Sequence, residues 1–391
     1  MIAVCGSILP ALAQAAESMP PASVVVAFDR EGLRPLIVEG LANKDSGRAV
    51  AANDPVRIAS ISKLIMALTA LRLMDEGKLD LERDVSDYLG WTLRSPYHPQ
   101  VPVTLAHLLS HRAGLSDAAG YIIPLGESLE AKLAEPAAWR DTGPPGEAAF
   151  EYANLGSPLV ATALEAASGE RYDALLERLV FAPLGIAACV NWTRCDEATK
   201  ARAVTLYRHT GEVARDDPAD LECPIPVAEG LACTLDDYVP GTNASVFSPQ
   251  GGVRIGMVDL AKIGQAMLRA EETGFLTEKA LLIWIYAMIN TVNSETRGEA
   301  AAGFCGYGLG AYIRHNSPPC RDDLFADGQE RIGHGGEAYG LRSGLWFDLG
   351  GGTGFAYFIT EVPPPSGVVE TSASDPREQA LIARARALME Q

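Results

Sequence analysis

Ser60 and Lys63 are the two residues of this chain whose types and spacing point most directly to chemistry. They lie within residues 57–68, where apolar residues at three-and-four spacing predict a buried helix that ends near Gly77. Because residues three apart share one face of a helix, the Lys63 amine can reach the Ser60 hydroxyl. The spacing therefore predicts a serine nucleophile with an amine as its activator, at a helix start that favours developing negative charge.

Tyr152 and Asn154, in the segment Tyr-Ala-Asn, supply a second pair of polar groups. A phenol is ordinarily a poor base, with a pKa of about 10. An adjacent ammonium lowers that pKa, so Tyr152 beside Lys63 would move toward tyrosinate and could accept the Ser60 proton. Asn154 can donate a hydrogen bond to a substrate carbonyl. The alternative for Tyr152 is an aromatic side chain that packs in the core with its hydroxyl satisfied.

Two histidines compete for a third position in such a site. His209 precedes Thr-Gly in a segment typical of the exposed turn of a hairpin. His334 is followed by Gly335 and Gly336 and precedes a strong strand pattern, and glycines let a backbone approach a ligand closely along a strand edge. We therefore predict that His334, rather than His209, belongs to the site.

The remaining candidates have simpler interpretations. His107 and His111 are four residues apart, but no glutamate completes a zinc-protease motif, so we interpret both as structural. The sequence predicts no metal and no other cofactor. Arg331 and Arg342 are either anchors for a substrate carboxylate or solvated charges.

The composition limits the size of the core and the kinds of partner. With 391 residues, of which 48% are hydrophobic and 21% charged, the chain can form one large domain or two closely packed ones. A formal charge of −18 argues against nucleic acid or an anionic membrane surface as partner, since both would be repelled. The body of the chain has no apolar run long enough to span a membrane. We expect a small molecule or a peptide as substrate.

The N-terminus and the cysteines together indicate export. Residues 1–16 resemble a secretory signal, although no basic residue precedes the apolar run. Its removal would leave six cysteines, for which the simplest local pairs are Cys189 with Cys195, Cys223 with Cys233, and Cys305 with Cys320. Disulfides form in oxidising compartments, so the expected location is periplasmic or secreted. The alternative is six free thiols in a cytosolic protein.

Periodicity predicts an α/β fold in which both chain ends build one antiparallel sheet flanked by helices. Strand patterns occur at residues 23–28, 36–40, 307–313, 341–347 and 355–360. Helices are predicted at 105–110 with Thr104 as N-cap, at 172–180, and near the C-terminus with Asp375 as N-cap, Pro376 at N1 and Glu378 at N3 of a capping box. We assign residues 17–78 and 300–391 to the sheet domain and residues 79–299 to an inserted, mostly helical region, with the site in a cleft between them.

Five segments in this order resemble the motifs of one family: residues 60–63 (SISK), 104–115, 152–154 (YAN), 248–252 with 259–261, and 333–336 (GHGG). The family is that of the class C type serine β-lactamases and penicillin-recognising hydrolases, which includes DD-peptidases, D-aminopeptidases and esterases. The resemblance covers most of the chain and implies the same α/β sheet with a helical domain.

The resemblance also implies a mechanism. Ser60 would attack a carbonyl and form an acyl-enzyme, with Lys63 and Tyr152 sharing the proton transfers. The backbone N–H groups of Ser60 and Glu337 would form the oxyanion hole, and Asn154, Gly335, Gly336 and Glu337 would bind substrate. The β-lactamase members have lysine where this chain has His334, so a D-amino-acid peptide or an ester is expected before a β-lactam. A ring nitrogen of His334 would donate to Tyr152 or to a substrate carboxylate. A non-catalytic ligand sensor is the alternative of another class.

Overall fold

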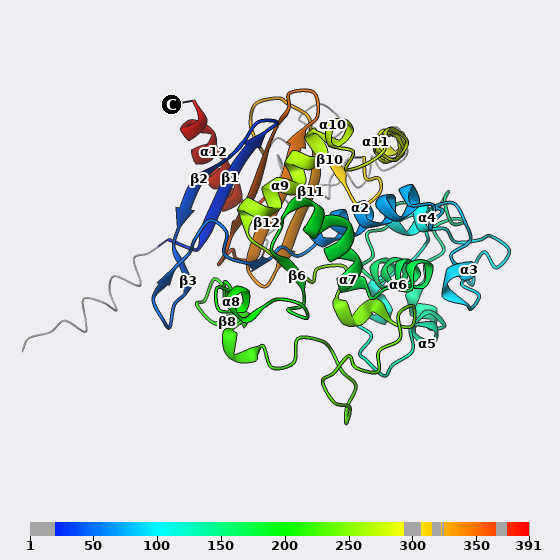
Figure 1. The fold of residues 1–391 in the computed structure, drawn as a ribbon. Coiled ribbons are helices and arrows are strands. Elements are labelled where there is room, and N and C mark those ends of the chain that lie inside the picture. The colour runs from blue at the N-terminus through cyan, green and yellow to red at the C-terminus, as the bar shows by residue number, and fades with distance from the viewer. Residues whose placement is uncertain (1–19, 293–305, 315–321, 323, 365–373, 391) are drawn as a thin grey trace, which may run out of the picture.

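The central element of the protein is a six-stranded antiparallel sheet. The computed structural model describes residues 20–292, 306–314, 322, 324–364 and 374–390. Both chain ends contribute to the sheet, whose order is β10-β11-β12-β13-β1-β2 (Figure 1). The strands are β1 (Ser23–Asp29), β2 (Leu33–Glu39), β10 (Tyr312–Arg314), β11 (Arg331–Ala338), β12 (Leu341–Asp348) and β13 (Thr353–Ile359). The first strand pairs with the last, from Ser23 opposite Ile359 to Asp29 opposite Thr353. The predicted α/β architecture is confirmed.

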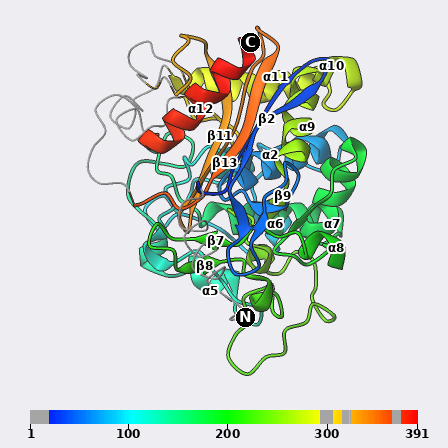
Figure 2. The same ribbon diagram turned by 90° about the vertical axis from the view of Figure 1, so that its left-hand side faces the viewer.

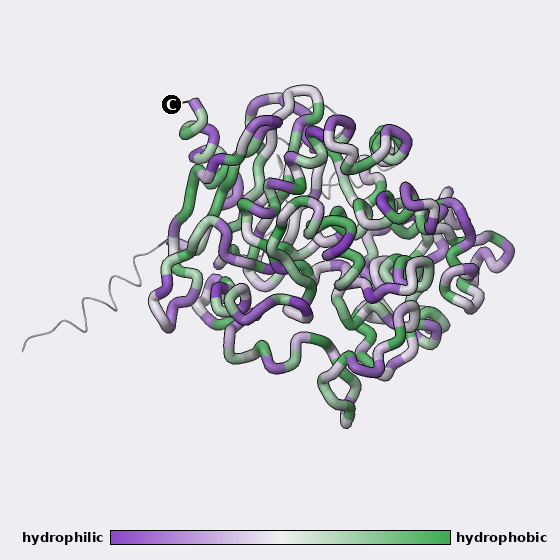
Figure 3. Tube along the Cα trace, in the orientation of Figure 1, coloured by the Kyte–Doolittle hydropathy of each residue, from purple (hydrophilic) through white to green (hydrophobic). Residues whose placement is uncertain are grey.

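Helices cover both faces of this sheet. Helix α9 (Met257–Leu268) packs on β1, β12 and β13, and α12 (Pro376–Met389) contacts β2. In Figure 2 the sheet separates α12 from α9. Alternate residues of β1 enter different cores: Val24 and Val26 belong to the large core, and Val25 belongs to a smaller cluster with Leu381 of α12. Burial on both faces explains why β1 is almost continuously apolar. In the hydropathy colouring of Figure 3, green hydrophobic segments run through the central elements.

The helical region lies beside one end of the sheet, and α2 (Ile61–Asp75) joins the two parts because it contacts both β11 and α6. The helical region contains α3 (Ser86–Leu89), α4 (Leu105–Leu109), α5 (Leu129–Leu133), α6 (Gly156–Ser168), α7 (Tyr172–Leu176) and α8 (Glu197–Lys200). Two further helices, α10 (Ala270–Thr273) and α11 (Glu278–Val292), follow α9 in the sequence. The described residues also form three small sheets. One pairs β3 (Leu41–Asn43) with β4 (Arg48–Ala49), and another pairs β7 (Leu206–Tyr207) with β8 (Val213–Arg215). In the third, β9 (Val253–Ile255) lies between β5 (Val56–Arg57) and β6 (Ala188–Val190).

Local sequence signals located most of these elements. The hairpin of β1 and β2, the helix that starts at Tyr172, and the end of α2 just before Gly77 agree with the predictions. Thr104 caps α4 by accepting a hydrogen bond from the His107 backbone N–H, and His107 Nδ1 accepts one from the Thr104 N–H in return. The structural role predicted for His107 is therefore confirmed.

Two local predictions were wrong. The strand predicted at residues 307–313 is limited to Tyr312–Arg314, because Gly310 adopts a φ of +64° and lies so close to α2 that a Cβ there would come within 2.6 Å of the Lys63 carbonyl oxygen. Asp375 does cap α12, by accepting from the Arg377 N–H, but Glu378 does not complete a capping box. Its carboxyl turns inward and accepts a hydrogen bond from the Tyr357 hydroxyl at 2.5 Å.

Two of the predicted disulfides are present, Cys189–Cys195 and Cys223–Cys233. The third predicted pair, Cys305 with Cys320, and the predicted signal at residues 1–16 lie outside the described residues. In the described part of the chain, none of the helices has the length and apolar character needed to cross a membrane. The domain boundaries at residues 78 and 299 stay predictions, and α9, from the segment between them, packs on the sheet.

Candidate active site

Ser60 lies at the N-terminus of α2, where the backbone is strained. The preceding residue, Ala59, has a φ of +48°, a left-handed conformation that residues with a Cβ rarely adopt and that is often kept at functional sites. Ser60 is the N-cap residue of α2. The Lys63 Nζ atom lies 3.1 Å from the Ser60 Oγ atom, as their i, i+3 spacing predicts. One helical turn therefore places the hydroxyl and the amine in direct contact.

Lys63 is 2% exposed, and its amine has two further partners. Nζ lies 2.7 Å from Asn154 Oδ1 and 3.2 Å from the Gln250 carbonyl oxygen, and both of these atoms can only accept hydrogen bonds. Burial lowers the pKa of Lys63 to about 7, although the charge of Asp117 opposes the shift. A neutral amine has two N–H bonds, which the two carbonyl acceptors occupy. Its lone pair then remains for the Ser60 O–H.

Tyr152 is beside the same hydroxyl, but not as a tyrosinate. Desolvation raises the pKa of Tyr152 above its ordinary value, and a hydrogen bond with Ser60 offsets this only in part. Lys63 Nζ lies over the face of the phenol ring, 4.7 Å from its centroid. The predicted shift toward tyrosinate was therefore wrong, because the phenol is desolvated and the amine beside it has a pKa near neutrality. Tyr152 stands next to Ser60 as a protonated hydroxyl.

Asn154 connects Lys63 to a carboxylate that the sequence analysis missed. Its Oδ1 accepts from Lys63, and its Nδ2 donates to Asp117 Oδ2 at 2.9 Å. Asp117 Oδ1 accepts from the Leu155 N–H at 2.9 Å, which fixes the carboxylate below the site. Asp117 takes one of the two Nδ2 N–H bonds of Asn154, which lines the cavity, so the hydrogen bond predicted from Asn154 to a substrate carbonyl depends on the second N–H and stays a prediction. The one local signal at Asp117 in the sequence is a Ser-Asp pair shortly after Gly114. Such pairs are common in turns and do not indicate a catalytic site.

His334 is 1% exposed and has partners for both ring nitrogens. His111 Nδ1 accepts from the Ala153 N–H at 3.2 Å, so its proton lies on Nε2 and points to the Tyr307 hydroxyl at 3.3 Å. Tyr307 in turn donates to His334 Nε2 at 3.0 Å, and His334 Nδ1–H donates to the Gly335 carbonyl at 2.5 Å. Burial first, and then the charge of Lys63, lower the pKa of His334 to about 3, so the ring is neutral.

This chain of hydrogen bonds corrects the role predicted for His334. Neither ring nitrogen is available to donate to Tyr152 or to a substrate carboxylate, because Tyr307 and Gly335 occupy them. His334 instead joins β11 to the segment that carries Tyr152. His111, predicted to be structural, is buried and belongs to the same chain.

Strand β11 passes Ser60 with glycines where side chains would not fit. A Cβ on Gly336 would overlap the Ile58 carbonyl oxygen and the Ser343 hydroxyl, so the close approach requires glycine. β10 pairs with β11 only between Arg331 and Gly333. Among the described residues, residues 335–338 therefore have a strand partner on the β12 side alone. This free edge is a place where a substrate main chain could pair.

A cavity of about 730 Å³ opens in front of Ser60. Its walls include the following residues: Tyr152, Asn154, Arg208, His209, Tyr312, Arg314, residues 334–343, Val362 to Pro364, and Glu378. His209 lies in the exposed turn between β7 and β8, as predicted, but that turn borders the cavity. Of the two arginines considered as anchors, Arg342 lines the cavity and pairs with Glu337 at 2.5 Å. Arg331 lies elsewhere, paired with Asp327.

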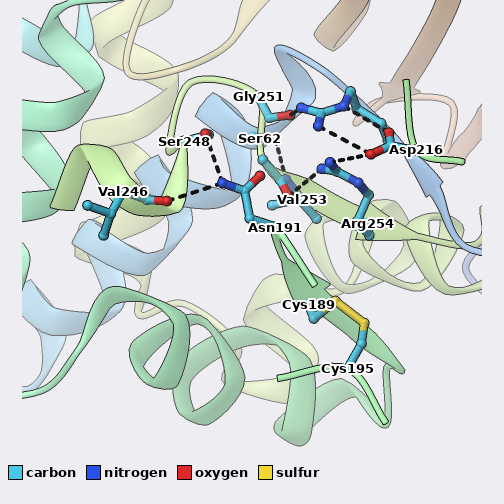
Figure 4. A network of polar contacts seen from close by, with 12 residues as sticks. Ser62, Cys189, Asn191, Cys195, Asp216, Val246, Ser248, Gly251, Val253 and Arg254 are labelled. Atoms are coloured by element: carbon cyan, nitrogen blue, oxygen red, sulfur yellow. Dashed lines mark hydrogen bonds and ion pairs between the residues drawn. A yellow bond between two sulfur atoms is a disulfide. The ribbon is translucent and has the colours of Figure 1, made fainter. Parts of the chain in front are cut away.

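The segment that presents the Gln250 carbonyl to Lys63 is held by a buried ionic network (Figure 4). Arg57 donates to the Gly251 carbonyl at 3.1 Å, and Arg254 donates to the Gly252 carbonyl at 2.7 Å. These two arginines are cross-strand neighbours in β5 and β9, and Asp216 accepts from both. Like charges opposite each other repel, so Asp216 is needed to hold the pair and the segment in place.

The fold and this constellation define the class of protein. The chain matches the family described as Beta-lactamase over residues 13–375 and belongs to that family, which confirms the resemblance seen in the motifs.

Individual relatives are similar to this chain over part of their length. It is 25% identical over 245 residues to Penicillin-binding protein 4 of Amycolatopsis lactamdurans and 28% identical over 265 residues to Esterase EstB of Burkholderia gladioli. Each match covers 61% of this chain and 63% of the relative, so the similarity spans less than two thirds of these relatives.

Solved structures extend the likeness over the whole fold. A D-amino acid amidase from Ochrobactrum anthropi SV3, complexed with L-phenylalanine, matches with a TM-score of 0.66 at 18% identity, covering 98% of this chain and 99% of that one. A D-stereospecific amidohydrolase from Streptomyces sp. matches with a TM-score of 0.61 at 22% identity, covering 95% and 97%. At such identities the likeness shows the shared fold.

Proposed function

We propose that this protein is a serine hydrolase that works through an acyl-enzyme on Ser60. The observation that carries the proposal is the environment of Lys63, whose amine has a pKa of about 7 and two fixed carbonyl acceptors. These contacts direct the lone pair of the neutral amine at the Ser60 hydroxyl 3.1 Å away. A general base is most effective when its pKa lies near the working pH.

The reaction follows from this geometry. Lys63 takes the Ser60 proton while Oγ bonds to the substrate carbonyl carbon, and the carbonyl oxygen becomes an oxyanion. The backbone N–H groups of Ser60 and Glu337 are the donors proposed for that oxyanion, and one such donor is typically worth about 10²–10³ in rate. Lys63, now an ammonium, supplies a proton to the departing amine or alkoxide. The protonated Tyr152 hydroxyl stabilises the charge on that leaving atom. Water then attacks the acyl carbon while Lys63 accepts its proton, the bond from that carbon to Ser60 Oγ breaks, and Lys63 returns the proton to Oγ, which releases the acid.

The substrate proposed is a D-amino-acid peptide or amide, or an ester. Relatives named for penicillin binding, esterase activity and D-amino acid amidase activity support this range. The free edge of β11 beside Ser60 suits an extended acyl donor. A β-lactam is the second candidate, because the neutral, fully bonded His334 offers no cation at the position where the β-lactamase members have lysine.

An exported location is part of the proposal. The disulfides Cys189–Cys195 and Cys223–Cys233 support it, since such bonds persist in oxidising compartments. Treatment of the native protein with a thiol alkylating reagent, followed by intact mass measurement, checks the state of these cysteines. Alkylation of all four without prior reduction would contradict the proposed location.

Labelling with a fluorophosphonate probe tests the function most directly. Wild type should become labelled, and Ser60→Ala should stay unlabelled while keeping its unfolding temperature. A blank result for both proteins would favour a non-catalytic ligand sensor. Turnover of p-nitrophenyl esters, D-alanyl peptides and nitrocefin by the same two proteins then ranks the substrates. Nitrocefin turnover equal to ester turnover would reverse the order proposed for β-lactams.

A further inference from the structure

The cavity in front of Ser60 reaches a second chemical group on the face of the sheet that α12 covers. Glu378, in the first turn of α12, lines this part of the cavity although it is only 4% exposed. Its Oε1 accepts from the Tyr357 hydroxyl at 2.5 Å. Among the described residues, no hydrogen-bond donor reaches Oε2. A buried carboxyl therefore offers one oxygen to the same space that Ser60 borders.

The cations near Glu378 are already paired. Arg314 donates to the Ser374 hydroxyl at 2.6 Å and forms an ion pair with Asp322 at 3.4 Å. Its guanidinium also lies over the Trp346 ring, 4.4 Å from the centroid.

Arg342 is paired with Glu337 at 2.5 Å. Arg314 and Arg342, which line the cavity, thus each have a carboxyl partner other than Glu378, namely Asp322 and Glu337. Neither of these two ion pairs involves the Glu378 carboxyl.

We propose that Glu378 forms a subsite for a primary ammonium group on the acyl donor. The inference rests on the proposed hydrolase function and adds a substrate class to it: amides or esters whose acyl part carries an amine. Buried charges are normally paired, and a substrate ammonium would supply the missing positive charge and a donor for Oε2.

Gly335 lines the same cavity as Glu378. A Cβ on Gly335 would lie 3.0 Å from the Tyr312 hydroxyl and 3.6 Å from the Trp346 ring, on the face that α12 covers. Burial raises the pKa of Glu378, and Arg314 and the Tyr357 hydrogen bond counter this only partly. An ammonium docked on Oε2 would oppose this rise and favour the ionised carboxylate.

A ladder of esters tests the subsite through catalysis. The substrates are p-nitrophenyl esters of linear ω-amino acids of increasing length, each paired with the uncharged fatty-acid ester of equal length. Wild type should show a maximum in the ratio of the two kcat/KM values at one chain length. Glu378→Gln keeps an acceptor for Tyr357 and should lower that maximum about tenfold, the usual worth of one charged hydrogen bond. Because each ratio compares a charged with an uncharged ester on the same protein, a general effect of the substitution on catalysis cancels.

Glu390 is an exposed carboxyl at the other end of α12. Glu390→Gln is therefore the matched control and should behave as wild type. Thermal unfolding of each variant establishes that it is folded. A ratio that does not depend on chain length, or that Glu378→Gln leaves unchanged, would overturn the subsite and make Glu378 a structural group.

A binding measurement separates failure of the subsite from failure of the hydrolase proposal. Binding of n-hexylammonium and of n-hexanol is measured by calorimetry with wild type and with Ser60→Ala. Both proteins retain Glu378. Preferential binding of the ammonium by both proteins would support the subsite even where no ester is turned over. Equal or absent binding of the two ligands would overturn it, whatever the esterase activity.

Discussion

The charge of Asp117 sets the pH at which Lys63 becomes a base, and removing that charge is a sharp test of the site. The hydrogen bonds that link Lys63 Nζ to Asp117 through Asn154 measure 2.7 and 2.9 Å. With the amide between them, the two charges lie roughly 6 Å apart, and at an effective dielectric constant of about 20 their attraction is about 3 kcal/mol, or about two pKa units. Asp117 is half-buried, so partial screening by solvent reduces the expected effect to about one to two units.

Asp117→Asn should therefore move the pH dependence of activity in a defined direction. Burial lowers the pKa of Lys63 to about 7, and Asp117 raises it toward its ordinary value. Because the neutral amine is the active form, kcat/KM of wild type should increase with pH through about 7. Loss of the carboxylate should move that rising limb about one to two units toward acid.

The assay is hydrolysis of a p-nitrophenyl ester whose leaving group is followed across the pH range, with a correction for the ionisation of nitrophenol. Asp45→Asn removes the same charge from an exposed position and should leave the limb in place. An unmoved limb in Asp117→Asn, or one that moves toward alkali, would refute the assignment of Lys63 as the base.

Three further changes have expected outcomes. Gly336→Ala should lower kcat by about 10² or more, because the new Cβ would overlap the Ile58 carbonyl and displace the strand that faces Ser60; ester kinetics with a melting curve check this. Asp216→Asn is compatible with the local φ of +59° but removes the carboxylate that pairs with two buried arginines. It should lower the free energy of unfolding at pH 7 by about 3 kcal/mol, as measured by denaturant titration. Burial raises the pKa of Asp216, but the two arginines lower it by more, so its pKa in the folded protein lies below the ordinary value. The difference in unfolding free energy between wild type and Asp216→Asn should therefore be at its full size above pH about 4 and become smaller only in stronger acid. Tyr307→Phe removes the donor to His334 Nε2 and should lower kcat about tenfold with little change in KM, measured by the same ester assay.

Short-range signals located the elements that carry the site. The i, i+3 spacing of Ser60 and Lys63 fixes their contact through one helical turn, and that contact is present at 3.1 Å. The caps Thr104 and Asp375 and the disulfides Cys189–Cys195 and Cys223–Cys233 also join residues close in sequence. Each of these depends on local geometry that residue type and spacing specify directly.

Signals failed where a distant element competes with a local one. Glu378 has the position and type of a capping residue, yet a buried Tyr357 hydroxyl from β13 takes its carboxyl. The segment before Tyr312 has a strand pattern, yet the close approach of Gly310 to α2 excludes a longer strand. In both cases a contact with a part of the chain far away in sequence outweighs the local preference.

The sequence alone determined which residues are available for acyl transfer: a serine and a lysine on one helix face, a tyrosine, an asparagine and a glycine-flanked histidine in the order of one family. The tertiary structure decided their chemical states. It lowers the pKa of Lys63 to about 7, which makes the neutral amine accessible near neutral pH, and it keeps Tyr152 protonated. It commits both nitrogens of His334 to neighbours. The reason is that a pKa and a hydrogen-bond direction depend on burial and on partners that meet only after folding.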